Sequence, residues 1–288
     1  MSSRRSQHRN QHTVQRAYLK RFANGQGKLW QYDKQSGLVT NVAASRATGQ
    51  PDFYTLRMKN GEESLAWETE VLGRQVEAPA AQSIGRILGS LRDPILDEDR
   101  RSLAVWIAMS AMRTTRARDE IDRTVTMELA RRFEQSSAPR DLRGRTPEFM
   151  SRNPHIVKNF PLLAVRHKVV EVTQEIYRRG WGIVRFEDFE LVTSDNPVAR
   201  YQDAFSKPTD WEEQPLFVLS LCPQVGLLVS RRYLEDYVIS PGDEYARWFN
   251  AKIVNSAYRF VYHNADDDKQ RYFPQLAPEE RRALYESP

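Results

Sequence analysis

The chain has 288 residues, of which 40% are hydrophobic, and a formal net charge of +5 at pH 7. This composition excludes a disordered chain and allows one large domain or two small ones, with a core of ordinary size. No apolar run approaches the roughly 20 residues of a membrane span, no signal-peptide core is present, and the single cysteine, Cys222, excludes an internal disulfide. We therefore expect a cytoplasmic protein without a membrane segment.

The positive charge is concentrated near the N-terminus. Residues 1–32 contain seven lysines and arginines and no acidic residue, so the remainder of the chain carries a net charge of −2. Residues 1–9 hold three arginines and, after Met1, no apolar residue, which predicts a flexible basic tail ahead of a single domain at 10–288. The basic segment is either a solvated surface or a patch that binds the phosphates of a nucleic acid.

A short helix is predicted from Thr13 to Phe22, because Val14, Tyr18 and Phe22 recur at helical spacing. Thr13 has the chemistry of an N-cap. His12 would then lie just before the helix N-terminus, where the dipole disfavours an imidazolium and favours a bound anion. His12 is either a structural histidine or part of a site.

Two long helices are predicted after a hairpin at 28–42. The first runs from 64 to 91 and bends near Pro79, and the second runs from 97 to 135. Arg113 lies on the apolar face of the second helix. A buried arginine needs a partner, so Arg113 either pairs with Glu68 or Glu70 of the preceding helix or holds a bound anion.

A loop at 136–153 and a third helix at 155–179 precede a region rich in strands. One hairpin is predicted between 181–186 and 189–193, and a second between 215–221 and 225–230. A helix carrying Asn250 and a last strand at 258–262 follow. The first hairpin would deliver a polar corner at 193–198.

The corner reads Thr-Ser-Asp-Asn-Pro-Val from Thr193 to Val198. Its side-chain oxygens and its proline are typical of a tight turn after a buried strand. Ser194 and Asp195 either cap this turn or point at a ligand. The sequence contains no Walker lysine loop, no G-x-G-x-x-G, no H-E-x-x-H, no C-x-x-C and no G-x-S-x-G, so it gives no support to those enzyme classes.

The segment from His12 to Phe22 and the intact corner at 193–198 together resemble a bacterial family of unknown function. Members of that family open with a signature like H-Y-V-P-x-F-Y-L-R-x-F and carry a later T-S-D-N-P-V. Further similarities lie at Arg113-Thr-Thr-x-x-Arg118 and at Phe249-Asn250. The resemblance spans residues 10–263. It implies that the polar positions shared with the family are candidate site residues: His12, Glu70, Arg113, Asp195, Asn196 and Asn250.

We expect an α+β domain in which long helices pack on a mostly antiparallel sheet. One hypothesis is an enzyme that cleaves phosphodiesters or otherwise handles phosphate on nucleic acid, in phage defence or as a toxin. Asp195 and Glu70 would then hold Mg²⁺ or Mn²⁺, and His12 would be the base. Arg113, Asn196 and Asn250 would bind substrate. The alternative is a non-catalytic binding or scaffold domain whose corner is a structural turn.

Overall fold

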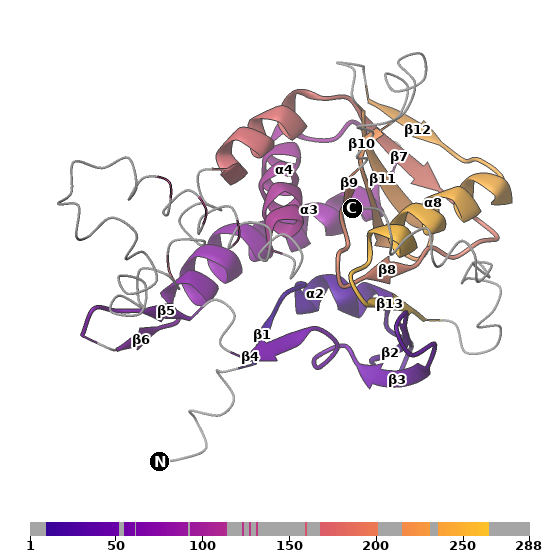
Figure 1. The fold of residues 1–288 in the computed structure, drawn as a ribbon. Helices are drawn as coiled ribbons and strands as arrows, with labels where there is room; N and C mark the ends of the chain where they lie inside the picture. The colour runs from indigo at the N-terminus through magenta and orange to yellow at the C-terminus, as the bar shows by residue number, and fades with distance from the viewer. Residues whose placement is uncertain are drawn as a thin grey trace.

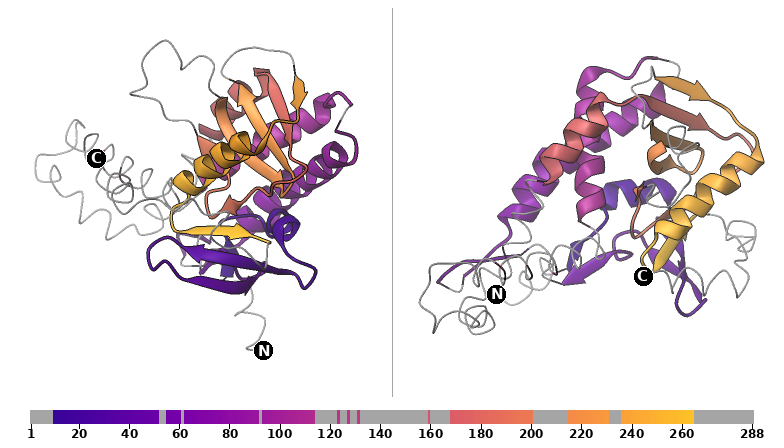
Figure 2. Two further views of the ribbon diagram at one scale, coloured as in Figure 1. Left: turned by 90° about the vertical axis from the view of Figure 1, so that its right-hand side faces the viewer. Right: turned by 45° about the horizontal axis from the view of Figure 1, so that its top comes forward.

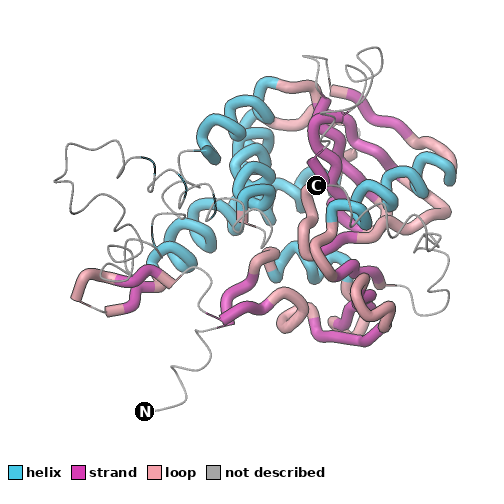
Figure 3. The backbone as a smooth tube through the Cα atoms, viewed as in Figure 1, coloured by secondary structure: helices cyan, strands magenta, loops and turns pink. Residues whose placement is uncertain are grey.

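The computed structural model describes residues 10–51, 55–60, 62–91, 93–113, 123, 127, 131, 159, 168–200, 215–230 and 236–264. Its class is α+β, as the sequence predicts: helices of the first half pack on a sheet built from the second half (Figures 1 and 3). The expected tail at 1–9 and loop at 136–153 lie outside the described residues. The single domain over 10–288 stays a prediction.

The larger sheet has the strand order β12-β7-β11-β10-β9, and only the pairing of β12 with β7 is parallel. The hairpin predicted at 215–230 is confirmed. The hairpin predicted between 181–186 and 189–193 is wrong, because β7 pairs with β11 and β12 instead. The strands are β7 (Trp181–Arg185), β9 (Ala199–Arg200), β10 (Pro215–Cys222), β11 (Val225–Ser230) and β12 (Tyr237–Ile239).

Both faces of this sheet are covered by helices. Successive side chains of a strand point to opposite faces, and the core divides in the same way. Ile183 and Leu227 pack into the cluster that contains residues of α3 (Ala78–Gly89) and α4 (Asp97–Met112). Their neighbours Val184 and Leu228 pack into the cluster of α8 (Asp243–Ser256). Helices α3 and α4 therefore cover one face of the sheet, and α8 covers the other (Figure 2).

A second, fully antiparallel sheet has the order β3-β2-β13-β8. This sheet joins the hairpin predicted at 28–42 to the last strand of the described chain. Its strands are β2 (Lys28–Asp33), β3 (Val39–Ala43), β13 (Phe260–His263) and β8 (Thr193–Ser194). The turn between β2 and β3 contains Gly37 at φ 72°, a left-handed conformation that favours glycine. Since β8 is an edge strand, the polar corner at 193–198 lies at the edge of this sheet.

The helix predicted over 64–91 consists of two parts. A π-helix labelled η2 (Trp67–Glu77) changes to α3 at Ala78, immediately before Pro79, which lacks the N–H that a continuing helix needs. Strands β5 (Leu56–Arg57) and β6 (Glu63–Ser64) precede η2. Helix α4 stops at Met112 within the second predicted helix; residues 123, 127 and 131 are again helical, and the rest of 114–135 lies outside the described residues. Residues 168–178 of the third are helical.

The N-terminal segment differs from its prediction at one point. Strand β1 (Asn10–His12) pairs with β4 (Gly49–Pro51), and Thr13 donates its hydroxyl to the carbonyl oxygen of Thr48 at 3.3 Å instead of capping a helix. The helix begins later, as α2 (Arg16–Leu19), and continues as the 3₁₀ turn η1 (Lys20–Phe22). His12 is therefore the last residue of a strand and not the neighbour of a helix N-terminus.

None of the helices within the described ranges combines the length and the apolar character needed to cross a membrane.

Candidate functional site

Asp195 is bonded to the backbone that leads into β13. Its Oδ1 accepts a hydrogen bond from the N–H of Tyr258 at 2.9 Å, and its Oδ2 accepts from Arg259 at 2.8 Å and Phe260 at 3.0 Å. Burial raises the pKa of Asp195, and these three donors oppose the rise by stabilising the carboxylate. Asp195 thus has the geometry of a cap for three consecutive N–H groups.

Asn196 and Asn250 join the corner to α8 in a similar way. Asn196 donates its amide to the carbonyl oxygen of Ser256 at 2.9 Å. Asn250, which is 2% exposed, accepts from the N–H of Val192 at 2.9 Å and donates to the carbonyl oxygen of Glu190 at 3.0 Å. Asp195, Asn196 and Asn250 are thereby brought to one junction, between the corner, α8 and β13, where they bond to backbone groups; Asn196 Oδ1 is buried there without a hydrogen-bond partner among the described residues.

Glu70 lies elsewhere, on η2. Its side chain is 59% exposed and pairs with Arg74 of the same helix at 3.7 Å. No hydrogen bond or ion pair joins Glu70 to Asp195, and no group of three or more His, Cys, Asp and Glu in the described ranges is arranged to hold a metal ion. The Asp195 oxygens already accept backbone N–H groups. Both carboxylates are therefore engaged with other groups, and the expected Mg²⁺ or Mn²⁺ site at Asp195 and Glu70 stays a prediction.

Arg113 pairs instead with Glu77, whose charge also acts on His12. Arg113 follows the last residue of α4, has a side chain that is 2% exposed, and donates Nη1 to Glu77 Oε1 at 2.5 Å. The sequence predicted an acidic partner on the preceding helix but favoured Glu68 or Glu70. Gln15 donates its amide to the carbonyl oxygen of Glu77 at 2.8 Å. We call His12, Gln15, Glu77 and Arg113 the His12 cluster.

The environment of His12 keeps its imidazole neutral. Burial lowers the pKa of His12, the positive charges of Arg16 and Arg113 lower it further, and Glu77 opposes them. The Nδ1 atom is buried and has no hydrogen-bond partner among the described residues. A neutral histidine with a ring nitrogen that is not engaged can accept a proton at neutral pH.

Glu77 is the residue that the sequence analysis missed. It is the last residue of η2, and π-helical segments often occur at functional sites. Pro79 marked the change of helix type, and Glu77 stands two residues before it. That proximity was the one local signal that could have directed attention to Glu77.

The comparisons with known proteins give a family and no activity. A family model described as "Protein of unknown function (DUF4238)" matches residues 10–267, which include all six family-like positions and Glu77. No curated protein matches the chain, and neither does any solved structure. The match covers well over half of the chain, so the chain belongs to the DUF4238 family.

Proposed function

We propose that this domain handles phosphate groups of a nucleic acid at the His12 cluster, with His12 as the general base. The observation that carries the proposal is the buried, unpartnered Nδ1 of a histidine whose pKa is lowered beside Arg113. The lowered pKa keeps the imidazole in the unprotonated form that a general base needs before it accepts a proton during phosphodiester cleavage. The proposal uses no metal, since Asp195 and Glu70 are engaged with other groups.

Positive charge for the phosphate comes from the segment around the cluster. Glu77 offsets the charge of Arg113 through their ion pair, so Arg113 alone is not a strong anion site. Arg16 is exposed, lowers the pKa of His12, and belongs to the basic stretch of residues 1–32. That stretch supplies the electrostatic attraction that a nucleic-acid backbone needs.

The test measures cleavage and binding of labelled single- and double-stranded DNA and RNA oligonucleotides. His12→Gln should reduce cleavage by about 10²- to 10⁴-fold, the usual contribution of a general base, while binding stays nearly unchanged. His8→Gln is the matched control, because it removes a histidine from the same basic segment. Equal cleavage by wild type and His12→Gln would overturn the catalytic role of His12.

A non-catalytic binding or scaffold domain is the second candidate. The observation that favours it is the junction at Asp195, Asn196 and Asn250, where the side chains bond to backbone groups. In that case the wild type binds oligonucleotides without cleaving them. The affinity should fall steeply with salt, because each neutralised phosphate releases counterions. Absence of binding at low salt would remove nucleic acid from both proposals.

A role in phage defence or as a toxin extends the catalytic proposal to the cell. Growth arrest on expression of the wild type, and normal growth with His12→Gln at equal protein level, is the result that this role requires. Arrest by both proteins would separate toxicity from the chemistry proposed for His12.

A further inference from the structure

A cavity of about 500 Å³ opens between the C-terminal end of α3, the start of α4 and strands β7 and β12. None of its lining residues belongs to the His12 cluster. This volume lies in the range of small-molecule sites, which are mostly apolar with a few convergent polar groups. The apolar part of the wall is made by aliphatic side chains: Ile87, Leu91, Ile95, Leu96, Ile183 and Val238.

Two of these side chains are unusually exposed for their type. Leu96 is 55% exposed and Val238 is 48% exposed, and both line the cavity from different elements, the start of α4 and the edge strand β12. Ile87 and Ile183 are 6% and 2% exposed and belong to the core behind the cavity. The apolar surface therefore continues from the core to the solvent, which suits a ligand with an aliphatic or aromatic body.

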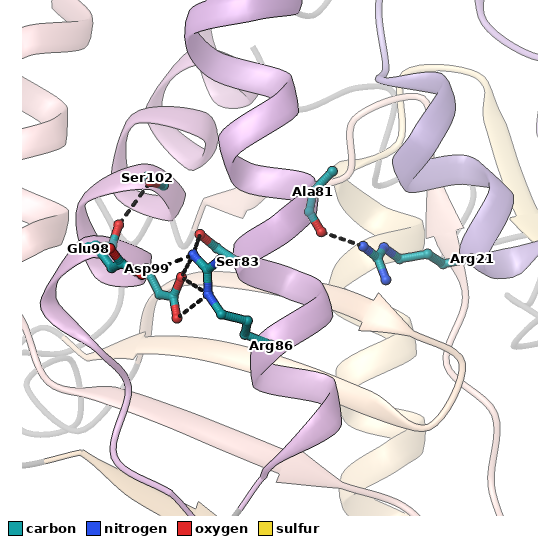
Figure 4. A network of polar contacts seen from close by, with 7 residues as sticks. All are labelled: Arg21, Ala81, Ser83, Arg86, Glu98, Asp99 and Ser102. Atoms are coloured by element: carbon teal, nitrogen blue, oxygen red, sulfur yellow. Dashed lines mark hydrogen bonds and ion pairs between the residues drawn. The ribbon is translucent and has the colours of Figure 1, made fainter.

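The polar part of the wall contains an ion pair that is already complete. Arg86 of α3 donates Nε to Asp99 Oδ1 of α4 at 2.9 Å and also bonds it through Nη2, and Figure 4 shows Ser83 and Glu98 beside this pair. Burial opposes ionisation of Asp99, but the bonds from Arg86 outweigh it and hold the pKa of Asp99 below its ordinary value. Asp99 thus largely neutralises the charge of Arg86 within the protein.

The remaining charges favour a cation in the cavity. The described lining has one arginine and three aspartates, Asp93, Asp99 and Asp236. Asp99 is paired with Arg86 and Asp236 with Arg100, so the charge that these pairs leave is that of Asp93. Asp93 is exposed, and within the described part of the chain its carboxylate accepts a hydrogen bond from the hydroxyl of Ser90. The positive end of the α4 dipole is met by Asp97 and Glu98 in its first turn. Arg92, in the same loop, lies outside the described residues.

We propose that this cavity binds a small organic ammonium compound, with its alkyl or arylalkyl body on the aliphatic wall and its ammonium group beside Asp93. The proposal is independent of the function assigned to the His12 cluster, since the two sites share no residue. The body of the ligand gains from leaving water, and the head gains from the attraction of the Asp93 carboxylate.

The test uses three probes of nearly equal shape, n-hexylammonium, hexanol and hexanoate, titrated into the full-length protein and followed by NMR of backbone amides. We expect saturable shifts in the α3–α4 connection and in β12. The ammonium should bind at least about fivefold more tightly than the alcohol, the effect of one unit charge about 4 Å away in a watery environment. Hexanoate should bind most weakly.

Two substitutions separate the roles of head and body. Asp93→Asn should weaken n-hexylammonium by about fivefold and leave hexanol unchanged, whereas Val238→Phe, which places a ring at the mouth of the cavity, should weaken both. Glu62→Gln and Leu38→Phe are matched controls at exposed positions outside the lining, and Leu38 is 64% exposed. Neither control should alter binding.

Three results would overturn the proposal. The first is the absence of saturable shifts with n-hexylammonium, and the second is binding of hexanoate as tight as that of the ammonium. The third is an equal loss of affinity in Asp93→Asn and Glu62→Gln. Because Asp93 is exposed and lies outside the core, Asp93→Asn stays informative even if Val238→Phe does not fold.

Discussion

Asp195 connects the corner at 193–198 to β13 through three backbone N–H groups. Replacing it with alanine removes both carboxylate oxygens, which together accept these three hydrogen bonds. We expect Asp195→Ala to lower the free energy of unfolding by about 2 kcal/mol, in the range for losing a cap or a bond to a charged acceptor. Asp195→Asn should cost less, because it keeps one side-chain oxygen. Urea denaturation of the three proteins measures both changes.

The same measurement tests whether Asp195 binds a metal. It is repeated with Mg²⁺ and with Mn²⁺, and Asp188→Ala is the control, because Asp188 is exposed. A structural cap predicts that neither ion shifts the midpoint of the wild type and that Asp188→Ala stays within about 0.5 kcal/mol. Stabilisation of the wild type by either ion, lost in Asp195→Asn, would restore a metal role to Asp195.

The site residues show which of their contacts a single sequence can predict. Arg113 is an arginine on an apolar face, and the need for an acidic partner on the preceding helix follows from that alone. The identity of the partner does not, because it depends on where α4 ends and on the π-helical geometry of η2, which shifts the face that each residue occupies. The pairing of Glu77 with Arg113, and with it the His12 cluster, therefore emerges only from the structure.

At the scale of secondary-structure elements, local contacts were predictable and distant ones were not. The hairpins β2–β3 and β10–β11 follow from alternating side chains around a short turn. The parallel pairing of β12 with β7 and the place of β13 between β2 and β8 join segments far apart in the chain. A sequence pattern fixes which face of a strand is apolar, but not which of several strands lies next to it.

Gly226 of β11 lies directly against Phe249 of α8. A Cβ at this position would lie 2.5 Å from Cζ of Phe249, a ring that is 0% exposed, and 3.3 Å from Cδ1 of Leu191. We expect Gly226→Ala to lower the free energy of unfolding by about 1–3 kcal/mol, because the helix or the ring must move within a packed core. Thermal or urea unfolding measures the loss.

Gly85 of α3 provides the matched control for this substitution. It is exposed, and a Cβ there would meet nothing within 4 Å. Alanine in a helix interior is favoured over glycine by about 0.5–1 kcal/mol, so Gly85→Ala should stabilise the protein. The opposite signs expected for one chemical change test the packing of α8 on β11. A neutral or stabilising Gly226→Ala would contradict that packing.

At the scale of the whole molecule, the N-terminal segment joins the two large sheets. The hydroxyl of Tyr18, in α2, lies 2.7 Å from Oγ1 of Thr193 in the four-stranded sheet and donates to the carbonyl oxygen of Ser220 in the five-stranded sheet at 2.7 Å. The Tyr18 ring is 1% exposed and lies 5.2 Å, between ring centroids, from that of Trp106 in α4. Burial raises the pKa of this hydroxyl well above its ordinary value, so it stays protonated and able to donate.

Tyr18→Phe tests whether these layers unfold together. Removing the hydroxyl leaves buried oxygens of Thr193 and Ser220 without this partner, and we expect a loss of about 1–3 kcal/mol. Tyr258→Phe is the control, because Tyr258 is 48% exposed. If the chain is one domain, tryptophan fluorescence and far-ultraviolet circular dichroism should report one transition that moves as a whole in Tyr18→Phe. If only one of two transitions moves, the helical and sheet regions are separate cooperative units, and the prediction of a single domain over 10–288 is wrong.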